Sequence, residues 1–316
     1  MAIPTDPALS RAPQPHAWGY RTAVPSQPAV SVSFEFFPPT DPEMETTLWN
    51  SVRRLAPLSP RFVSVTYGAD GSTRDRTLEI VRRLQADTAL TVAPHITSVG
   101  ASRAELLELA RNYWTSGVRR VVALRGDLPD QGPGVAASDA FRWGLDLVRG
   151  LRSVADFDIS VAAYPEVHPQ ARSAQDDLDN LKRKIDAGAT RALTQFFFDN
   201  GAYLRFRDAC VAAGIAVPIV PGILPIMRFP QVQRFARRCG AMIPDWLARR
   251  FEGLDEDVET RRLLGAAVAL EQVEHLQRHG VSEFHFYTLN RADLTYAICH
   301  ALGVRYQQVM PAPQSA

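Results

Sequence analysis

The sequence predicts a single (β/α)₈ barrel, the TIM-barrel fold, with extra helices between its seventh and eighth strands. Three observations lead to this prediction. Short β-rich runs alternate with longer helical patterns from residue 30 onward, the runs are apolar on both faces, and no change in composition marks a linker. Strands of this kind joined by helices form a parallel sheet that is covered on both sides. Eight repeats of strand and helix are the number that closes such a sheet into a barrel.

The predicted elements follow one another in a regular order along the chain. Strands are expected at residues 32–37, 62–67, 90–97, 120–124, 159–164, 192–197, 217–223 and 284–288. Helices are expected at residues 43–55, 74–85, 103–115, 139–154, 173–187, 202–213, 229–238 and 291–302. Two further helical patterns, at 244–251 and 255–279, exceed the simple repeat, and the second is amphipathic, which favours packing on the outside of the barrel.

An open, doubly wound sheet is the alternative fold. A dinucleotide-binding sheet of that type usually carries a glycine-rich turn after its first strand. The sequence has no G-x-G-x-x-G, no G-x-x-x-x-G-K-[ST] and no G-x-S-x-G motif. The first two absences favour the barrel, and the third removes support for a serine hydrolase.

The composition is that of an ordinary globular protein. Its 316 residues are 46% hydrophobic and 22% charged, and 35 Lys and Arg balance 34 Asp and Glu for a net charge of +1. Such a balance creates no overall field that would attract nucleic acid or an anionic membrane. The three cysteines lie far apart, and the sequence shows neither a signal peptide nor a membrane-spanning run. We therefore expect a cytoplasmic protein that uses no metal.

The domain organisation is expected to be simple. Residues 1–29 contain six prolines among small polar residues, which predicts a flexible N-terminal extension. Residues 30–304 form the predicted single barrel domain, and residues 305–316 form a C-terminal tail.

Glu35 is the first candidate for a catalytic residue. It stands among Phe34, Phe36 and Phe37 and is followed by two prolines, as if a buried strand ended with one acid. Burial among phenylalanines would favour the protonated carboxyl group. The alternative is a glutamate at an edge strand that points into water.

Polar residues end nearly every predicted strand. Because the carboxyl ends of the strands of a parallel barrel open on one face, these residues are expected to meet there. They are Glu35, Thr66, Tyr67, His95, Thr97, Arg125, Gly126, Asp127, Tyr164, Glu166, His168, Gln195, Thr288, Asn290 and Arg291.

A second group lies on the predicted helix at 173–187. Asp177, Asn180 and Lys184 have i, i+3 and i+7 spacing and share one face, with Arg183 beside them. A solvated face with an ion pair is one interpretation. A groove for phosphate and hydroxyl groups is the other, because the helix follows the loop that contains Tyr164 and His168.

Five stretches resemble the bacterial methylenetetrahydrofolate reductases: residues 33–39, 124–129, 162–169, 180–199 and 284–291. The resemblance extends over about residues 30–304 and implies a (β/α)₈ flavoprotein with tightly but non-covalently bound FAD. Such an enzyme oxidises NADH and reduces 5,10-methylenetetrahydrofolate to 5-methyltetrahydrofolate, which supplies methyl groups for methionine synthesis. The two substrates use one site in turn, and a homodimer or homotetramer is expected.

The resemblance also implies roles for individual residues. Glu35 matches the general acid that protonates N10 of the folate, and Asp127 matches an aspartate near both flavin and pterin. Gln195 matches a glutamine that contacts the nicotinamide donor and the folate, and Arg291 matches an arginine of the folate site. Gln231 and Phe235 match the loop that covers the folate.

The FAD-binding set implied by the resemblance is larger. It comprises Thr66, Tyr67, Ala69, His95, Arg125, Gly126, Asp127, Ala137, Tyr164, His168, Ala171, Asp177, Asn180, Arg183 and Lys184. The sequence departs from the family at residues 128–138, a shorter loop in which Ala136 replaces an aromatic residue. Two other functions fit parts of the pattern: a flavin-dependent barrel oxidoreductase that acts on proline, and a barrel that binds folate or flavin without turnover.

Overall fold

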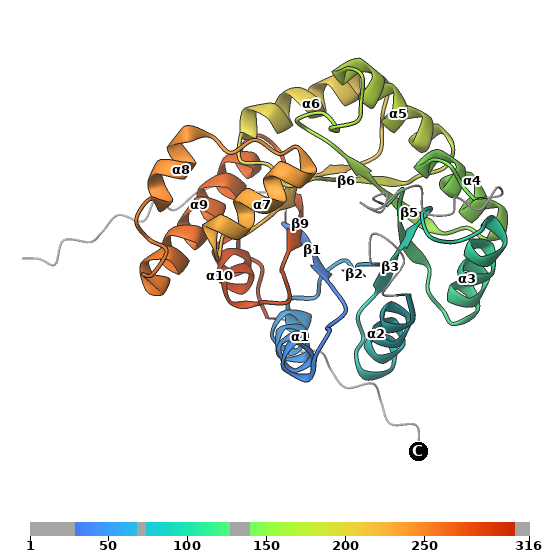
Figure 1. Ribbon diagram of the computed structural model, residues 1–316, viewed down its shortest axis with the longest axis horizontal. Coiled ribbons are helices and arrows are strands. Elements are labelled where there is room, and N and C mark those ends of the chain that lie inside the picture. The colour runs from blue at the N-terminus through green and yellow to red at the C-terminus, as the bar shows by residue number, and fades with distance from the viewer. Residues whose placement is uncertain (1–28, 68–73, 127–139, 307–316) are drawn as a thin grey trace, which may run out of the picture.

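The computed structural model describes residues 29–67, 74–126 and 140–306. Most of the predicted extension and tail, residues 1–28 and 307–316, and the segments 68–73 and 127–139 lie outside the described residues. Within the described ranges, nine parallel strands form a nearly closed barrel that is surrounded by helices (Figure 1). The predicted TIM-barrel fold is confirmed.

The strands are hydrogen-bonded in the order β7-β6-β5-β4-β3-β2-β1-β9-β8, and every pair is parallel. Their bounds are β1 Ser31–Phe36, β2 Val63–Val65, β3 Val92–Thr97, β4 Arg120–Leu124, β5 Asp158–Ala163, β6 Arg191–Thr194, β7 Ile219–Val220, β8 Gly222–Ile223 and β9 Glu283–Tyr287.

The helices cover the outside of the barrel (Figure 1). They are α1 Pro42–Leu55, α2 Arg74–Asp87, α3 Arg103–Thr115, α4 Gly144–Val154, α5 Ala174–Asp186, α6 Asn200–Ala212, α7 Phe229–Cys239, α8 Asp245–Phe251, α9 Val258–Arg278 and α10 Asp293–Ala301, with a short 3₁₀ helix at Ala56–Leu58. Both extra helical patterns predicted between strands seven and eight are present, as α8 and α9. Among the described residues, none of the helices combines the length and apolar character needed to cross a membrane.

The seventh predicted strand is divided into two short pieces, β7 and β8. Pro221 has no backbone N–H to donate and lies between them. The first piece pairs with β6 and the second with β9, and the Pro221 carbonyl accepts from His285 N at 3.0 Å. The barrel therefore closes across this kink rather than through one continuous strand.

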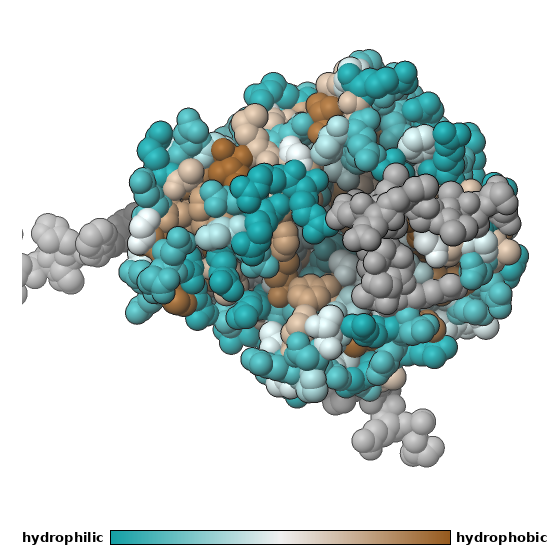
Figure 2. Space-filling model, in the orientation of Figure 1, coloured by the Kyte–Doolittle hydropathy of each residue, from teal (hydrophilic) through white to brown (hydrophobic). Residues whose placement is uncertain are grey.

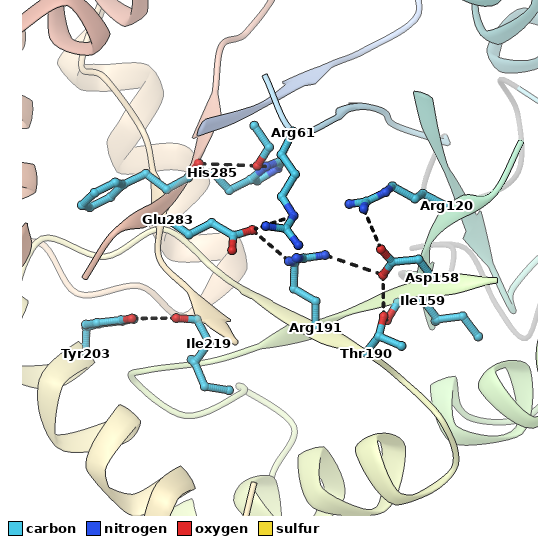
Figure 3. A network of polar contacts seen from close by, with 12 residues as sticks. Arg61, Arg120, Asp158, Ile159, Thr190, Arg191, Tyr203, Ile219, Glu283 and His285 are labelled. Atoms are coloured by element: carbon cyan, nitrogen blue, oxygen red, sulfur yellow. Dashed lines mark hydrogen bonds and ion pairs between the residues drawn. The ribbon is translucent and has the colours of Figure 1, made fainter. Parts of the chain in front are cut away.

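A network of ion pairs closes the amino-terminal end of the barrel (Figure 3). Arg191, at the start of β6, is only 3% exposed and donates from Nε to Glu283 Oε1 on β9 at 2.9 Å. Its Nη1 lies 3.6 Å from Asp158 Oδ1 on β5, and Arg120 Nη2 on β4 lies 3.0 Å from the other oxygen of that carboxylate. Side chains from four strands are thereby joined beneath the barrel core, including across the place where β7 is short.

Phe62 lies above this network inside the barrel. The guanidinium carbons of Arg120 and Arg191 are 5.6 and 5.8 Å from its ring centroid, and the ring of His285 stacks on it at 5.8 Å and 21°. With Ala93, Val122, Leu193 and Val220 it forms the small interior core. The larger core lies between the strands and the outer helices. This interior core therefore separates the ion pairs at the amino-terminal end from the groups at the opposite, carboxyl end.

Gly222 tests whether closure at the kink depends on a close approach of strands. A Cβ at this position would lie 2.2 Å from the Thr194 carbonyl oxygen and 2.6 Å from the Tyr287 ring. Gly222→Ala should therefore reduce the free energy of unfolding by about 3 kcal/mol, the upper end of ordinary overpacking. Urea denaturation measures the loss. The control is Gly201→Ala, whose Cβ meets mainly the end of the Arg205 side chain; an equal loss in both variants would contradict the explanation.

Candidate active site

Glu35 lies inside the barrel between two histidines. Its Oε2 is 3.4 Å from His95 Nε2 on β3 and 3.7 Å from His285 Nε2 on β9. The second ring nitrogen of His285 is 2.8 Å from the hydroxyl oxygen of Ser33. Both imidazoles are buried, whereas the Glu35 side chain is 20% exposed. Among these four side chains, Ser33 and His285 share a hydrogen bond, while the Nε2 atoms of both histidines face the carboxylate at ion-pair distance without satisfying the geometry of a hydrogen bond.

The alternation of side chains along β1 explains why this environment differs from the expected one. Ser33 and Glu35 point into the barrel, while Phe34 and Phe36 point outward into the core beneath the helices. The prediction that phenylalanines surround the carboxyl group was wrong, because sequence neighbours on a strand occupy opposite faces. The groups that face Glu35 come from strands far away in the sequence.

The same geometry reverses the expected direction of the pKa shift. Burial by itself raises the pKa of Glu35, but the imidazoles of His285 and His95 beside the carboxylate outweigh it and lower the pKa from 4.5 to about 2. The prediction of a protonated acid in the free protein was therefore wrong. With this pKa the carboxylate is ionised at neutral pH.

The turn after β9 holds the end of β1 in place. Thr288 Oγ1 donates to the Glu35 carbonyl at 2.6 Å. The side chain of buried Asn290 accepts from Phe37 N at 3.0 Å and donates to Phe37 O at 2.8 Å. Asn290 has a left-handed φ of 58°, which asparagine tolerates well, and the next residue, Arg291, is exposed. One turn thus fixes the backbone around Glu35 and presents Arg291 at the same face.

Helix α5 and the loop after β5 form a second polar group. Lys184 donates from Nζ to the Ala162 carbonyl at 2.8 Å, and burial lowers its pKa from 10.5 to about 8, against the opposing effect of Asp177. Asp177 Oδ2 accepts from His168 N at 2.8 Å. Asn180 is half-buried on the same face, but Arg183 is exposed. This face is therefore not simply solvated, as one interpretation of the sequence supposed.

Arg125 connects this group to the start of α4. Its guanidinium hydrogen-bonds Gln170 and lies 5.5 Å from the ring centroid of Trp143, which is 50% exposed. A Cβ on Gly144 would lie 3.9 Å from both Arg125 N and Lys184 Cδ. Gly126 follows with a φ of 84°, a conformation that favours glycine. An exposed aromatic plane thus lies beside Arg125, and Gly144 lies between Arg125 and Lys184.

The remaining predicted FAD-binding residues lie around the same end of the barrel where the structure describes them. Thr66 N donates to the Phe36 carbonyl at 2.9 Å, and Tyr67 is buried. Tyr164 and His168 form an edge-to-face pair with centroids 4.5 Å apart, and Ala171 N donates to the His168 carbonyl. Ala69, Asp127 and Ala137 lie outside the described residues.

Gln195 and helix α7 lie on another side of the opening at the carboxyl end of the barrel, which we call the mouth. Gln195 follows β6, and its Oε1 accepts from its neighbour Phe196 N at 2.9 Å. Gln231 and Phe235 are half-buried on α7, and Phe235 packs against the same apolar cluster as Tyr287. The Tyr287 hydroxyl donates to the Thr194 carbonyl at 2.7 Å, and burial followed by the charge of Glu35 raises its pKa well above 10. In the space-filling view, the surface is hollowed near the middle of this face (Figure 2).

Several site residues were not identified from the sequence. Ser33 and His285 belong to the Glu35 group, and Trp143 and Gly144 lie beside Arg125 and Lys184. The sequence did contain a signal for the first pair. Ser33 and Glu35 are two residues apart on a predicted strand, so both side chains lie on the same face, and polar residues on an inward face indicate a site. Trp143 carried no such signal, because an aromatic residue before a helix usually belongs to the core.

Comparison with known proteins agrees with this geometry. A family model described as methylenetetrahydrofolate reductase matches residues 21–303. The chain belongs to the methylenetetrahydrofolate reductase family. It is 58% identical over 279 residues to the 5,10-methylenetetrahydrofolate reductases of Salmonella typhimurium and Escherichia coli, a span that covers 88% of this chain and 93% of each relative. Its activity is accordingly methylenetetrahydrofolate reduction, and its class is oxidoreductase.

Two more distant similarities show how far the family and its fold extend. Methylenetetrahydrofolate reductase (NADH) 1 of Arabidopsis thaliana is 35% identical over 294 residues, which cover 89% of this chain and 50% of that protein. A solved structure of a Clostridium thermocellum protein, described as binding two copies of 5-methyl-5,6,7,8-tetrahydrofolic acid, superposes with a TM-score of 0.62 at 16% identity. It covers 89% of this chain and 96% of its own, and at this identity the similarity concerns the fold.

Asn290 provides a test of the turn after β9. Asn290→Ala removes two hydrogen bonds and leaves the N–H and carbonyl of Phe37 without those partners, so we expect the free energy of unfolding to fall by about 2 kcal/mol. Urea denaturation measures the change. The matched control is Asn50→Ala, because Asn50 only accepts a surface hydrogen bond from Arg53. Equal stability of the two variants would show that the turn is held by other contacts.

Proposed function

We propose that the protein uses FAD to transfer electrons from NADH to 5,10-methylenetetrahydrofolate and forms 5-methyltetrahydrofolate, a methyl source for methionine synthesis. Family membership supports the reaction, and the group formed by Ser33, His285, Glu35 and His95 is the observation that carries the mechanism. It brings a carboxylate and two imidazoles together at the carboxyl end of the barrel. Assembly into a homodimer or homotetramer remains a prediction.

The residues around α4, α5 and the loop after β5 fit a flavin dinucleotide. Lys184 and Arg125 provide positive charge for a pyrophosphate, and the Lys184 ammonium has donors left after its bond to Ala162 O. Gly144 leaves room between them, and exposed Trp143 offers an aromatic face. Thr66, Tyr67, His95, Gly126, Tyr164, His168, Ala171, Asp177, Asn180 and Arg183 are the other described members of the proposed set, with Ala69, Asp127 and Ala137 outside the described residues.

The bound FAD would accept electrons from NADH and return them as a hydride to the folate. Side chains of the protein would transfer the proton that the reaction needs. N10 of the folate must be protonated for its five-membered ring to open, and Glu35 is proposed as the group that delivers this proton. The Glu35 carboxylate would take up this proton before it passes to N10, His95 and His285 would be its neighbours in that transfer, and Ser33 orients His285 through its second ring nitrogen.

Other side chains are proposed to bind and orient the substrates. Gln195 would hydrogen-bond the nicotinamide and the folate in turn, and Arg291, exposed at the mouth, would pair with an acidic group of the folate. Gln231 and Phe235 would cover the pterin from α7. Asp127 would favour the positive charge that develops when the folate ring opens.

Glu35→Gln separates the two half-reactions. In the wild type, anaerobic NADH should bleach the flavin absorption and methylenetetrahydrofolate should restore it. In the variant, NADH should still bleach the flavin at a near-normal rate, but reoxidation by the folate should slow by about 10²–10⁴-fold, the contribution of a positioned general acid. Stopped-flow absorbance measures both rates.

Glu43→Gln, an exposed residue in the first turn of α1, is the matched control for this experiment. Equal loss of both half-reactions in Glu35→Gln would show that Glu35 is not the proton donor to the folate. A purified protein that is colourless and cannot be loaded with FAD would reject the proposed cofactor.

The lowered pKa of Lys184 predicts how FAD binding depends on pH. Its pKa of about 8 lies below that of an ordinary lysine, so its positive charge is present below pH 8 and is lost as the pH rises through that value. The FAD dissociation constant of the wild type should therefore increase between pH 7 and 9. Lys184→Gln should bind about 10–100-fold more weakly at pH 7, the value of a charged hydrogen bond, and should lose the pH dependence.

Fluorescence titration of FAD measures these constants. Lys182→Gln is the control, because Lys182 lies two residues away on α5 but pairs with Asp186 on the surface. A wild-type dissociation constant that stays unchanged from pH 7 to 9 would place the Lys184 ammonium away from the cofactor phosphates.

A further inference from the structure

The loop after β5 and the turn after α7 are joined at two points. Glu166 Oε2 accepts from Met242 N at 2.9 Å, across 76 positions of sequence. At the second point, Gly240 ends α7 with a φ of 72°, and a Cβ there would lie 2.6 Å from Pro169 Cγ. The two segments therefore approach so closely that only glycine fits between them.

Glu166 is held firmly on the side of the β5 loop. The next residue, Val167, has a left-handed φ of 70°, which is strained for a β-branched side chain and persists only where the surroundings enforce it. Those surroundings are visible: Val167 N donates to Tyr164 O, and His168 N donates to Asp177 Oδ2. The strained turn directs the half-buried carboxylate of Glu166 toward α7.

Helix α7 has one clear anchor at each end. At its start, Phe229 stacks on Phe251 of α8 with centroids 5.0 Å apart and planes at 3°. Just past its other end, the only side-chain hydrogen bond to the backbone of the turn at residues 240–242, within the described part of the chain, is the one that Glu166 accepts. Gln231 and Phe235 lie between the two anchors.

We propose that Glu166 is a positioning residue that sets the C-terminal end of α7 over the mouth of the barrel and thereby orients Gln231 and Phe235 toward the folate. Through Glu166, the loop that carries the flavin-side residues Tyr164 and His168 is connected to the helix that covers the second substrate. The inference rests on the proposed function, since it assigns α7 to folate binding.

Burial of Glu166 agrees with this role. Its pKa is raised, first by burial and further by the charge of Asp199, while the hydrogen bond from Met242 N opposes the shift. Tyr164, Gln195 and Cys239 border the small space of about 10 Å³ beside the carboxylate, which has room for about one water molecule. Loss of the Glu166 side chain would therefore let water enter between the β5 loop and the turn after α7.

The test compares Glu166→Ala with Glu166→Gln. The alanine variant loses the acceptor, so amide hydrogen exchange in residues 229–242 of the FAD-loaded, substrate-free protein should become about fivefold faster, and the KM for methylenetetrahydrofolate should rise by about the same factor, the value of one hydrogen bond. The glutamine variant keeps an acceptor oxygen and should restore both. Glu105→Ala, which removes a glutamate that accepts a backbone N–H at the start of α3, is the matched control.

Met242→Pro removes the donor from the other side and keeps the test informative if Glu166→Ala does not fold. It should reproduce the effects of Glu166→Ala, and the double variant should be no worse than either, because both remove the same bond. Unchanged exchange in residues 229–242, or a fall in kcat without a change in KM and exchange, would overturn the inference. Failure of the proposed function would look different: the wild type itself would show no flavin reduction or folate turnover, whereas the exchange measurement needs neither substrate.

Discussion

A carboxylate inside a barrel must have its charge compensated, and much of this structure follows from how this is achieved for Glu35. Burial of an ionised acid is costly unless its charge is compensated. Here His95 and His285 compensate it from two other strands, and Ser33 holds His285 from the strand of the acid itself. The parallel register between β1 and β9 places Ser33 opposite His285 and Glu35 opposite Tyr287. The pairing of these two strands therefore sets the geometry of the site.

The two ends of the barrel are built in opposite ways. At the amino-terminal end, Arg191 is almost fully buried, joins Asp158 to Glu283 and lies against Phe62. At the carboxyl end, the surface is hollowed near its middle (Figure 2), and Glu35 lies there beside His95 and His285. His285 stacks on Phe62 and contacts Glu35, so it separates the sealed end from the reactive one. This polarity is general for parallel barrels and explains why the chemistry is found on one face.

The site also depends on contacts between loops, which fix the helices around it. Asn290 holds the backbone of Phe37, and Glu166 holds the turn after α7. Both act on main-chain groups, so they control where neighbouring side chains point. Residues with left-handed backbones lie at or beside these contacts, namely Val167, Gly240, Leu289 and Asn290. Strain is tolerated at these positions because the surrounding hydrogen bonds enforce it.

The sequence by itself determined the barrel, its order of strands and helices and the face that carries the site, because these depend on local periodicity and on the geometry of parallel strands. It also identified Glu35 and Lys184 as candidates. Only the tertiary structure decided their ionisation: the phenylalanines next to Glu35 in sequence turned away from it, and histidines 60 and 250 positions distant took their place. It likewise decided that strand seven breaks at Pro221 and that Trp143 lies beside Arg125. The reason is physical, since a pKa and a contact depend on which groups meet through space, and a local pattern records only which groups are neighbours along the chain.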